Sequence, residues 1–149
     1  MISKILVPSD GSKTARKAAE YAIDLAKQLK ASIIALSVID KRSFMPQTVP
    51  ASETARHTIE PVEDYLREAA EAYAGEIKKL CDNSDVEAKI SIKMGHPVEE
   101  IVKEAKRSKA NLIVMGSHGR SSLSATVLGS VSYGVIHNDK NIPILIVRG

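Results

Sequence analysis

The most informative segment of the chain reads Leu112-Ile-Val-Met-Gly-Ser-His-Gly119, followed by nine residues and then by Gly129-Ser130. Its uninterrupted apolar start is typical of a strand buried on both faces, and the apolar run stops at Gly116. Glycines after a strand allow positive φ angles and the close approach of a ligand to the backbone. Successive amide groups in such a loop, together with a following helix N-terminus, form a donor surface suited to phosphate oxygens. We therefore predict an anion-binding loop that uses no lysine.

The composition is that of an ordinary soluble globular chain. Its 149 residues fit one domain, 1–149, with 44% hydrophobic and 26% charged residues. The formal net charge is +3, but acids are interleaved with the bases, and with 3% aromatic residues there is no base-stacking platform. We therefore expect no nucleic-acid partner. Cys81 is the only cysteine, and no apolar stretch is long enough to span a membrane, so we expect a cytoplasmic protein without membrane contact.

Apolar periodicity predicts strands that alternate with helices along the whole chain. The predicted strands lie at 2–8, 33–39, 86–92, 112–116 and 143–147. The predicted helices start after an N-cap at Ser12 or Thr14, at Pro61, after Gly95-His96-Pro97, and after the glycine loop with Val127, Leu128, Val131 and Val135 on one face. Such an order indicates an α/β fold with a parallel sheet and helices on both faces. The third strand alternates between apolar and polar residues, which favours a position at a sheet edge.

Two segments that carry polar residues follow strands at the same end of the predicted sheet. Pro8-Ser9-Asp10 ends the first strand, and the loop at 116–119 ends the fourth. Ligands of open α/β sheets bind beyond the carboxyl ends of the strands, where the strand order reverses. The two segments meet if the first and fourth strands are neighbours. Segment 40–55 has two prolines and no sustained period, which predicts a long loop of the kind that forms lids or binding segments.

The apolar pattern of the last predicted strand indicates self-association. Ile142, Ile144 and Ile146 alternate with Leu145 and Val147, so a free edge there would be apolar on both faces. Pairing of this strand, 142–148, with its symmetry mate would cover the edge in a homodimer.

The glycine spacing resembles a known family. Gly116-Ser-His-Gly119, nine residues, then Gly129-Ser130 is similar to the Gly-x-x-Gly-x9-Gly-(Ser/Thr) signature of the ATP-binding branch of the universal stress proteins. The Pro8-Ser-Asp-Gly-Ser12 turn, the final Pro143-Ile-Leu-Ile-Val-Arg and the order of elements agree across essentially the whole chain.

The resemblance implies a single-domain, Rossmann-like, five-stranded parallel sheet of order 3-2-1-4-5 that binds ATP at the carboxyl ends of the strands. It also implies a homodimer, and a stress-response or regulatory module that acts on an unknown protein partner. Mg or Mn accompanying ATP would be held mainly by the phosphates. The residues that the resemblance places around the ribose and phosphates are Gly116, Ser117, His118, Gly119, Gly129, Ser130 and Val131, and those nearer the nucleoside are Pro8, Asp10, Val38 and Met115.

Each polar candidate also has a plain structural interpretation. Asp10 suits a ribose contact or an Asx turn before a glycine, and Ser130 suits a phosphate contact or a helix N-cap. His118 and Arg120 suit phosphate contacts or simple exposure to solvent, and the remaining histidines show no metal-ligand spacing.

The chain lacks a P-loop Gly-x-x-x-x-Gly-Lys-(Ser/Thr), so we expect binding with slow or absent hydrolysis rather than an enzyme. Two alternatives remain open, namely an adenine-nucleotide α-hydrolase-like enzyme that forms an adenylated intermediate, and a dimeric scaffold without nucleotide. The segment Ser9-Asp-Gly-Ser12 does not match the Ser-Gly-Gly-x-Asp-Ser loop expected of the former, and the intact glycine signature argues against the latter. A phosphoacceptor receiver domain would need paired acids after the first strand, where only Asp10 is present.

Overall fold

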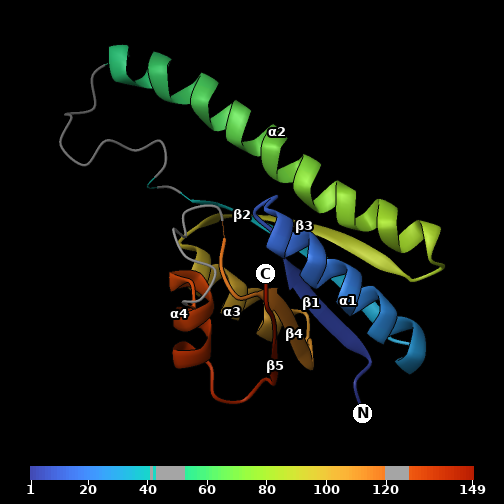
Figure 1. Ribbon diagram of the computed structural model, residues 1–149. Coiled ribbons are helices and arrows are strands. Elements are labelled where there is room, and N and C mark those ends of the chain that lie inside the picture. The colour runs from blue at the N-terminus through green and yellow to red at the C-terminus, as the bar shows by residue number, and fades with distance from the viewer. Residues whose placement is uncertain (41, 43–52, 120–127) are drawn as a thin grey trace.

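The computed structural model describes residues 1–40, 42, 53–119 and 128–149, which form one sheet flanked by helices (Figure 1). In chain order the elements are β1 (Lys4–Pro8), α1 (Lys13–Leu29), β2 (Ser32–Asp40), α2 (Glu53–Asn83), β3 (Ala88–Gly95), α3 (Pro97–Arg107), β4 (Leu112–Gly116), α4 (Ser130–Asn138) and β5 (Ile144–Val147). The alternation of strands and helices confirms the predicted α/β class. None of the helices in these residues is both long and apolar enough to cross a membrane.

The strands pair in the order β3-β2-β1-β4-β5, and every pairing is parallel. β1 lies between β2 and β4, with Ile5 paired to Ile33 on one side and to Leu112 on the other. The chain leaves β1 toward β2 and later crosses back to form β4, so the strand order reverses between these two strands. This confirms both the predicted order 3-2-1-4-5 and the adjacency on which the predicted site depends.

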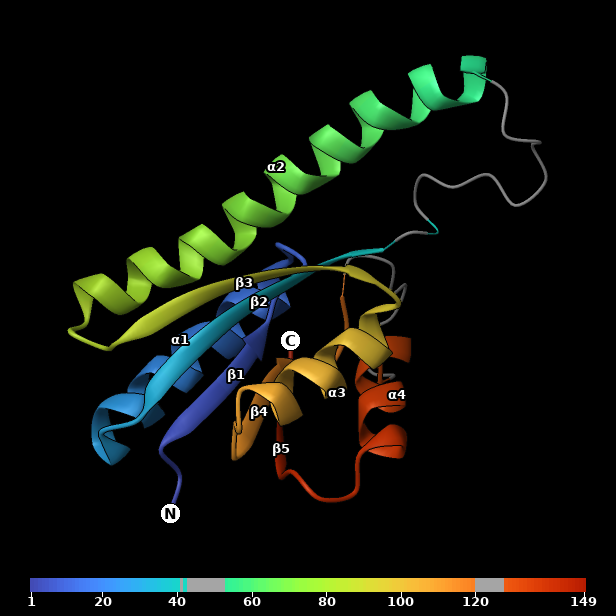
Figure 2. The same ribbon diagram turned by 180° about the vertical axis from the view of Figure 1, so that it is seen from behind.

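Helices cover both faces of the sheet and enclose two cores. α1 and α2 lie on one face, over a core that includes Ile5 and Ile33, and α3 and α4 lie on the other, over Leu6, Leu36 and Ile113 (Figures 1 and 2). Ile5 and Leu6 are both fully buried although they point to opposite faces, as expected for a central parallel strand. α2 extends beyond the sheet at its N-terminal end, as both views show.

Two helix starts differ from the prediction. α2 begins at Glu53 rather than at Pro61, so the predicted loop 40–55 is wrong at its C-terminal end, and residues 41 and 43–52 lie outside the described part of the chain. Pro61 lies inside the helix, where it removes one backbone donor without ending the 31-residue helix. α4 begins at Ser130, so Leu128 precedes the helix instead of lining it, and Val127 is outside the described residues.

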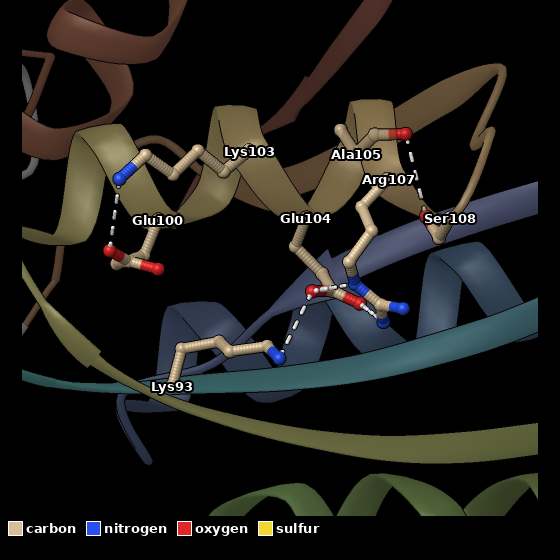
Figure 3. A network of polar contacts seen from close by, with 7 residues as sticks. All are labelled: Lys93, Glu100, Lys103, Glu104, Ala105, Arg107 and Ser108. Atoms are coloured by element: carbon tan, nitrogen blue, oxygen red, sulfur yellow. Dashed lines mark hydrogen bonds and ion pairs between the residues drawn. The ribbon is translucent and has the colours of Figure 1, made fainter.

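A buried carboxylate joins α3 to the edge strand β3 (Figure 3). Glu104 is 2% exposed; its Oε2 accepts a hydrogen bond from Arg107 Nε at 3.0 Å, and Lys93 Nζ lies 3.7 Å from the same oxygen. Arg107 Nη2 bonds the other oxygen, Oε1. Burial by itself raises the pKa of Glu104, but the hydrogen bond and charge of Arg107 and the charge of Lys93 outweigh it. The pKa of Glu104 therefore lies below its ordinary value.

We expect Glu104 to make the fold acid-sensitive. Because its pKa is lowered in the folded state, it contributes stability above the unfolded pKa of about 4.3, and this contribution is lost as the pH falls through the lower folded value. The difference in urea unfolding between wild type and Glu104→Gln should therefore be largest at pH 7 and should shrink as the pH falls below about 4, while the exposed Glu71→Gln should follow wild type throughout. A stability difference between wild type and Glu104→Gln that stays constant with pH would contradict this assignment.

Candidate functional site

A cavity of about 440 Å³ opens at the carboxyl ends of β1, β2 and β4. Ten of the eleven residues proposed from the sequence line it: Pro8, Asp10, Val38, Met115, Gly116, His118, Gly119, Gly129, Ser130 and Val131. Its other lining residues are Ser9, Ala15, Leu36, Asp40, Pro97, Ile101, Leu128 and Ser132. The volume falls within the range of roughly 300–1,000 Å³ that small-molecule sites occupy. The crossover between β1 and β4 thus brings together segments more than a hundred residues apart in sequence.

The turn after β1 is held by its own side chains. Ser9 Oγ accepts a hydrogen bond from the Gly11 amide at 3.1 Å, and Asp10 Oδ1 accepts one from the Ser12 amide at 3.0 Å. The Asp10 bond is the Asx turn of the plain structural interpretation, and Asp10 is also one of the residues that line the cavity. Ser12 then caps α1 by accepting from the Ala15 amide at 3.1 Å, so Ser12 and not Thr14 is the N-cap.

The loop glycines are required for space and not for positive φ. Among the described glycines only Gly11 and Gly95 have a positive φ, so Gly116 and Gly119 do not use the positive φ angles that glycine allows. A Cβ at Gly116 would lie 2.6 Å from Thr14 Cγ2, and a Cβ at Gly119 would collide with the Asp10 carboxylate. The loop after β4 therefore packs directly against the start of α1 and the turn after β1, and a side chain at either glycine would force Thr14 or Asp10 to shift.

Two of the amides expected to face a ligand are bonded within the protein. The Ser117 amide donates to the Val147 carbonyl at 2.9 Å, and the Gly129 amide donates to the Ser117 carbonyl at 2.6 Å. Ser117 is 7% exposed and is the one proposed residue that does not line the cavity. These bonds tie the loop to β5 and to the start of α4, so Ser117 positions the loop. The other loop and helix residues His118, Gly119, Ser130 and Val131 line the cavity.

His118 is held in place by two hydroxyl groups. Its Nε2 lies 3.1 Å from Thr14 Oγ1, and its Nδ1 lies 3.2 Å from Ser117 Oγ. Thr14 belongs to α1, so this histidine joins the loop after β4 to the first helix. The interpretation of His118 as a merely solvated loop residue is therefore wrong.

The N-terminus of α4 faces the cavity. Gly129 occupies the N-cap position in an extended conformation without a side-chain cap, and Ser130 is the first helical residue rather than the cap. Ser132 Oγ donates to the Gly116 carbonyl at 2.7 Å and fixes the helix to the end of β4. The first amides of a helix have no partner within the helix, and they carry the positive end of its dipole. This part of the cavity therefore suits an anionic group.

The opposite end of the cavity, formed by β2 and α3, was missed by the sequence analysis except for Val38. Leu36, Val38 and Asp40 alternate along β2 and line one wall, with Pro97 and Ile101 of α3 beside them. Asp40 Oδ2 accepts a hydrogen bond from Arg42 Nη2 at 2.8 Å, and this contact lowers the pKa of Asp40. The signal for Asp40 was its period-two spacing from Val38, whereas no local pattern indicated the helix residues.

The candidate site thus has an apolar end with one ionised carboxylate and a polar end at a helix N-terminus. In the described residues no group of three or more His, Cys, Asp or Glu side chains is placed to hold a metal ion. Arg120 lies outside the described part of the chain. The arrangement defines a doubly wound α/β domain with a ligand-sized cavity at its topological switch point.

Comparison with known proteins gives the family. The model of the universal stress protein family matches residues 1–148, and the chain belongs to this family. Universal stress protein MJ0531 of Methanocaldococcus jannaschii is 33% identical over 99% of this chain and 83% of its own length. MJ0577 of the same organism is 34% identical over 99% of this chain and 96% of its own length.

Solved structures agree with this assignment. The structure of MJ0577 superposes with a TM-score of 0.85 at 33% identity, covering 100% of this chain and 97% of that one. A universal stress protein solved in complex with cAMP superposes with a TM-score of 0.62 at 25% identity, covering 99% of this chain and 97% of that one. The resemblance seen in the glycine spacing is therefore confirmed at the level of the family and of the fold.

Proposed function

We propose that this universal stress protein binds an adenine nucleotide, ATP in the first instance, in the cavity at the switch point. The observation that carries the proposal is the glycine-lined wall, where the loop after β4, the turn after β1 and the N-terminus of α4 lie against one another around one cavity. The relative solved with cAMP adds support, because cAMP contains the same adenosine phosphate chemistry.

The two ends of the cavity give the nucleotide an orientation. The phosphates lie against His118, Gly119, Ser130 and Val131, where the dipole of α4 favours negative charge. The ionised Asp40 disfavours phosphates at the β2 end, so the base lies there between apolar side chains. Asp10, between the two ends, accepts hydrogen bonds from the ribose hydroxyls. A divalent cation that accompanies ATP is held mainly by the phosphates.

We propose that the bound nucleotide acts as a signal rather than as a substrate, with hydrolysis slow or absent. Rapid phosphoryl transfer needs a base or water-positioning group, a metal ion and positive charge at the leaving oxygen. Both ring nitrogens of His118 already lie at hydrogen-bond distance from hydroxyl groups, so this residue is a poor candidate for the base. In this proposal, nucleotide occupancy alters a surface that a protein partner recognises during stress.

The experiment that tests nucleotide binding starts with the purified protein. We expect denaturation to release adenine nucleotide in a ratio approaching one per chain, and stripped protein to bind ATP in isothermal titration. ATP at a hundred times its Kd should stabilise the fold by about 2.7 kcal/mol, a rise in Tm of about 5–11 °C. A stripped protein that binds neither ATP nor ADP contradicts the proposal, and ADP formation at several turnovers per minute contradicts the non-enzymatic role.

We also propose that the protein is a homodimer through residues 142–148. β5 is an edge strand that pairs only with β4 among the described strands. Ile142, Ile144 and Ile146 pack against the α3 side of the sheet and Leu145 packs against the α1 side, all of them only partly buried. A strand added from a second copy would cover the apolar side chains on both faces of β5 and would pair with the free backbone groups at its edge.

The oligomeric state tests this interface. Light scattering at micromolar concentration should give twice the chain mass for wild type and the single mass for Ile144→Glu, because a charge at the centre of the paired edge opposes association. Ile90→Glu provides the matched control, since Ile90 lies on the other edge strand and is 44% exposed. A monomeric wild type, or an Ile144→Glu variant that remains dimeric, contradicts the interface.

A further inference from the structure

A second, larger cavity lies on the α3 face of the edge strand β3, away from the candidate nucleotide site. This cavity, here called the β3 groove, has a volume of about 680 Å³ and is lined by Lys4, residues 32–34 and 87–93, Glu104 and residues 107–109. It shares no lining residue with the first cavity. Its lining residues come from β3 on one side and from the C-terminal half of α3 on the other. Figure 3 shows Lys93 of β3 pointing toward Glu104 and Arg107 of α3.

The groove exists because β3 is polar on this face. Lys89, Ser91 and Lys93 pair in register with Ile34, Leu36 and Val38, so they continue the sheet surface that elsewhere lies under α3 and α4. On the other face, Ala88 and Ile92 of β3 pack into the core beneath α2. The strand therefore has one apolar face that packs partly beneath a helix and one cationic face that forms the groove wall.

The positive charge of the groove is built into its wall. Five cationic side chains line it, those of Lys4, Lys89, Lys93, Arg107 and Lys109, against only two carboxylates, Glu87 and Glu104. The wall of the groove therefore carries a surplus of positive charge.

The buried Glu104 organises the cations instead of cancelling them. It holds the Arg107 guanidinium through Nε and Nη2 and lies 3.7 Å from the Lys93 ammonium, while the Arg107 side chain stays 66% exposed (Figure 3). A guanidinium has five N–H donors, so those that Glu104 does not use remain for a ligand. A fixed guanidinium loses less entropy on binding a carboxylate than a freely moving one.

The free edge of β3 adds main-chain donors and acceptors to this charge. β3 is eight residues long and pairs only with β2 among the described strands. Lysines on an edge strand oppose its pairing with the same strand of a second copy, because like charges would lie opposite each other. The same lysines favour an added strand whose side chains on that face are acidic.

We propose that the β3 groove binds an extended acidic segment of a partner protein, which adds to the edge of β3 as a further strand. Lys89 and Lys93 are four residues apart, about 13 Å along the strand. A partner segment with carboxylates at alternate positions places them opposite Lys89, Ser91 and Lys93. Its intervening apolar side chains lie beside Ile90, which is 44% exposed on the α2 side. This inference does not rest on nucleotide binding.

Binding of a fluorescein-labelled peptide of about nine residues that alternates Glu with Val tests the proposal by anisotropy. We expect saturable binding to wild type that weakens as salt is raised. The exposed pair Lys89→Glu, Lys109→Glu should weaken binding at least about tenfold, since each change reverses a cation in the groove wall. The matched pair Lys13→Glu, Lys17→Glu, on exposed positions of α1 on the other sheet face, should bind within about twofold of wild type.

Two further probes separate strand addition from charge attraction alone. The same peptide N-methylated at alternate amides keeps its charge but loses main-chain donors, and we expect it not to bind. The proposal is overturned if the methylated peptide binds as tightly as the unmodified one. It is also overturned if the two double lysine variants lose the same amount of affinity for the peptide. Double-stranded DNA that displaces the peptide at lower concentration than unlabelled peptide also overturns it, because the groove would then be a nucleic-acid surface.

Discussion

The substitution Gly129→Val is expected to weaken ATP binding by about 100-fold or more while the sheet remains folded. A Cβ at Gly129 would lie 3.0 Å from His118 Cα and 3.3 Å from the Ser117 carbonyl oxygen. Both neighbours are backbone atoms, and the Ser117 carbonyl also accepts the Gly129 amide, so neither can move without opening the loop. The two methyl groups of valine must therefore separate the start of α4 from the loop after β4. With these two segments apart, they no longer lie together around the phosphate groups, as the proposed binding requires.

Isothermal titration with ATP measures the effect of Gly129→Val. Gly75→Val is the matched control, because a Cβ at Gly75 has no atom within 4 Å among the described residues and the site should bind ATP as in wild type. A Gly129→Val protein that binds ATP within threefold of wild type would contradict the proposed phosphate site. Circular dichroism and thermal unfolding establish whether each variant is folded.

A second variant tests the same site without adding bulk to the loop. Ser130 is the first residue of α4, where proline is tolerated, and the extended Gly129 is compatible with a following proline. Ser130→Pro removes one amide and one hydroxyl from the cavity wall, and we expect ATP binding to weaken about tenfold with little change in Tm. Unchanged affinity would show that the α4 N-terminus does not contact the phosphates.

The substitution Gly11→Val is expected to destabilise the protein by about 2–4 kcal/mol, which lowers Tm by about 5–15 °C. Gly11 has a φ of 77°, a conformation that a β-branched residue adopts only with strain. A Cβ there would also collide with the ring of Tyr73 on α2. The turn that carries Asp10 to the cavity is thus held against the second helix, and Gly11→Val disturbs both.

A double-mutant cycle separates the two causes of this loss. In a Tyr73→Ala background the collision disappears while the backbone strain stays, so Gly11→Val should cost about 1 kcal/mol less there than in wild type. Gly75→Val again serves as control for valine on an open surface. Thermal unfolding within 2 °C of wild type for Gly11→Val would contradict the close packing of Tyr73 over this turn.

Most of the fold could be predicted from the sequence because each strand carries a strong local pattern. The apolar run at 112–115 and the alternation from 86 to 92 indicated a central strand and an edge strand, and the sheet has both. The start of α2 could not be predicted in the same way. Pro61 suggested a helix start, but the helix that contains it begins eight residues earlier.

The part of the candidate site that could be predicted is the part that the glycine spacing and the family resemblance cover. Ten of the eleven proposed residues line one cavity, although their contact with a nucleotide stays a prediction. Asp40, Pro97 and Ile101 were missed because they come from β2 and α3, far from the glycine segment in sequence. The role of Ser117 also differs, since its amide bonds Val147 on a strand that only the fold brings alongside.

Local sequence patterns are enough to predict the alternation of elements, the edge position of β3 and the glycine positions, because each depends on neighbours within a few residues. Tertiary structure alone decided that Gly116 and Gly119 are needed for contact with Thr14 and Asp10 rather than for positive φ. It also decided that Glu104 is buried between Lys93 and Arg107. The physical reason is that steric contact and burial depend on which distant segments the parallel crossovers bring together, and residue spacing along one strand does not contain that information.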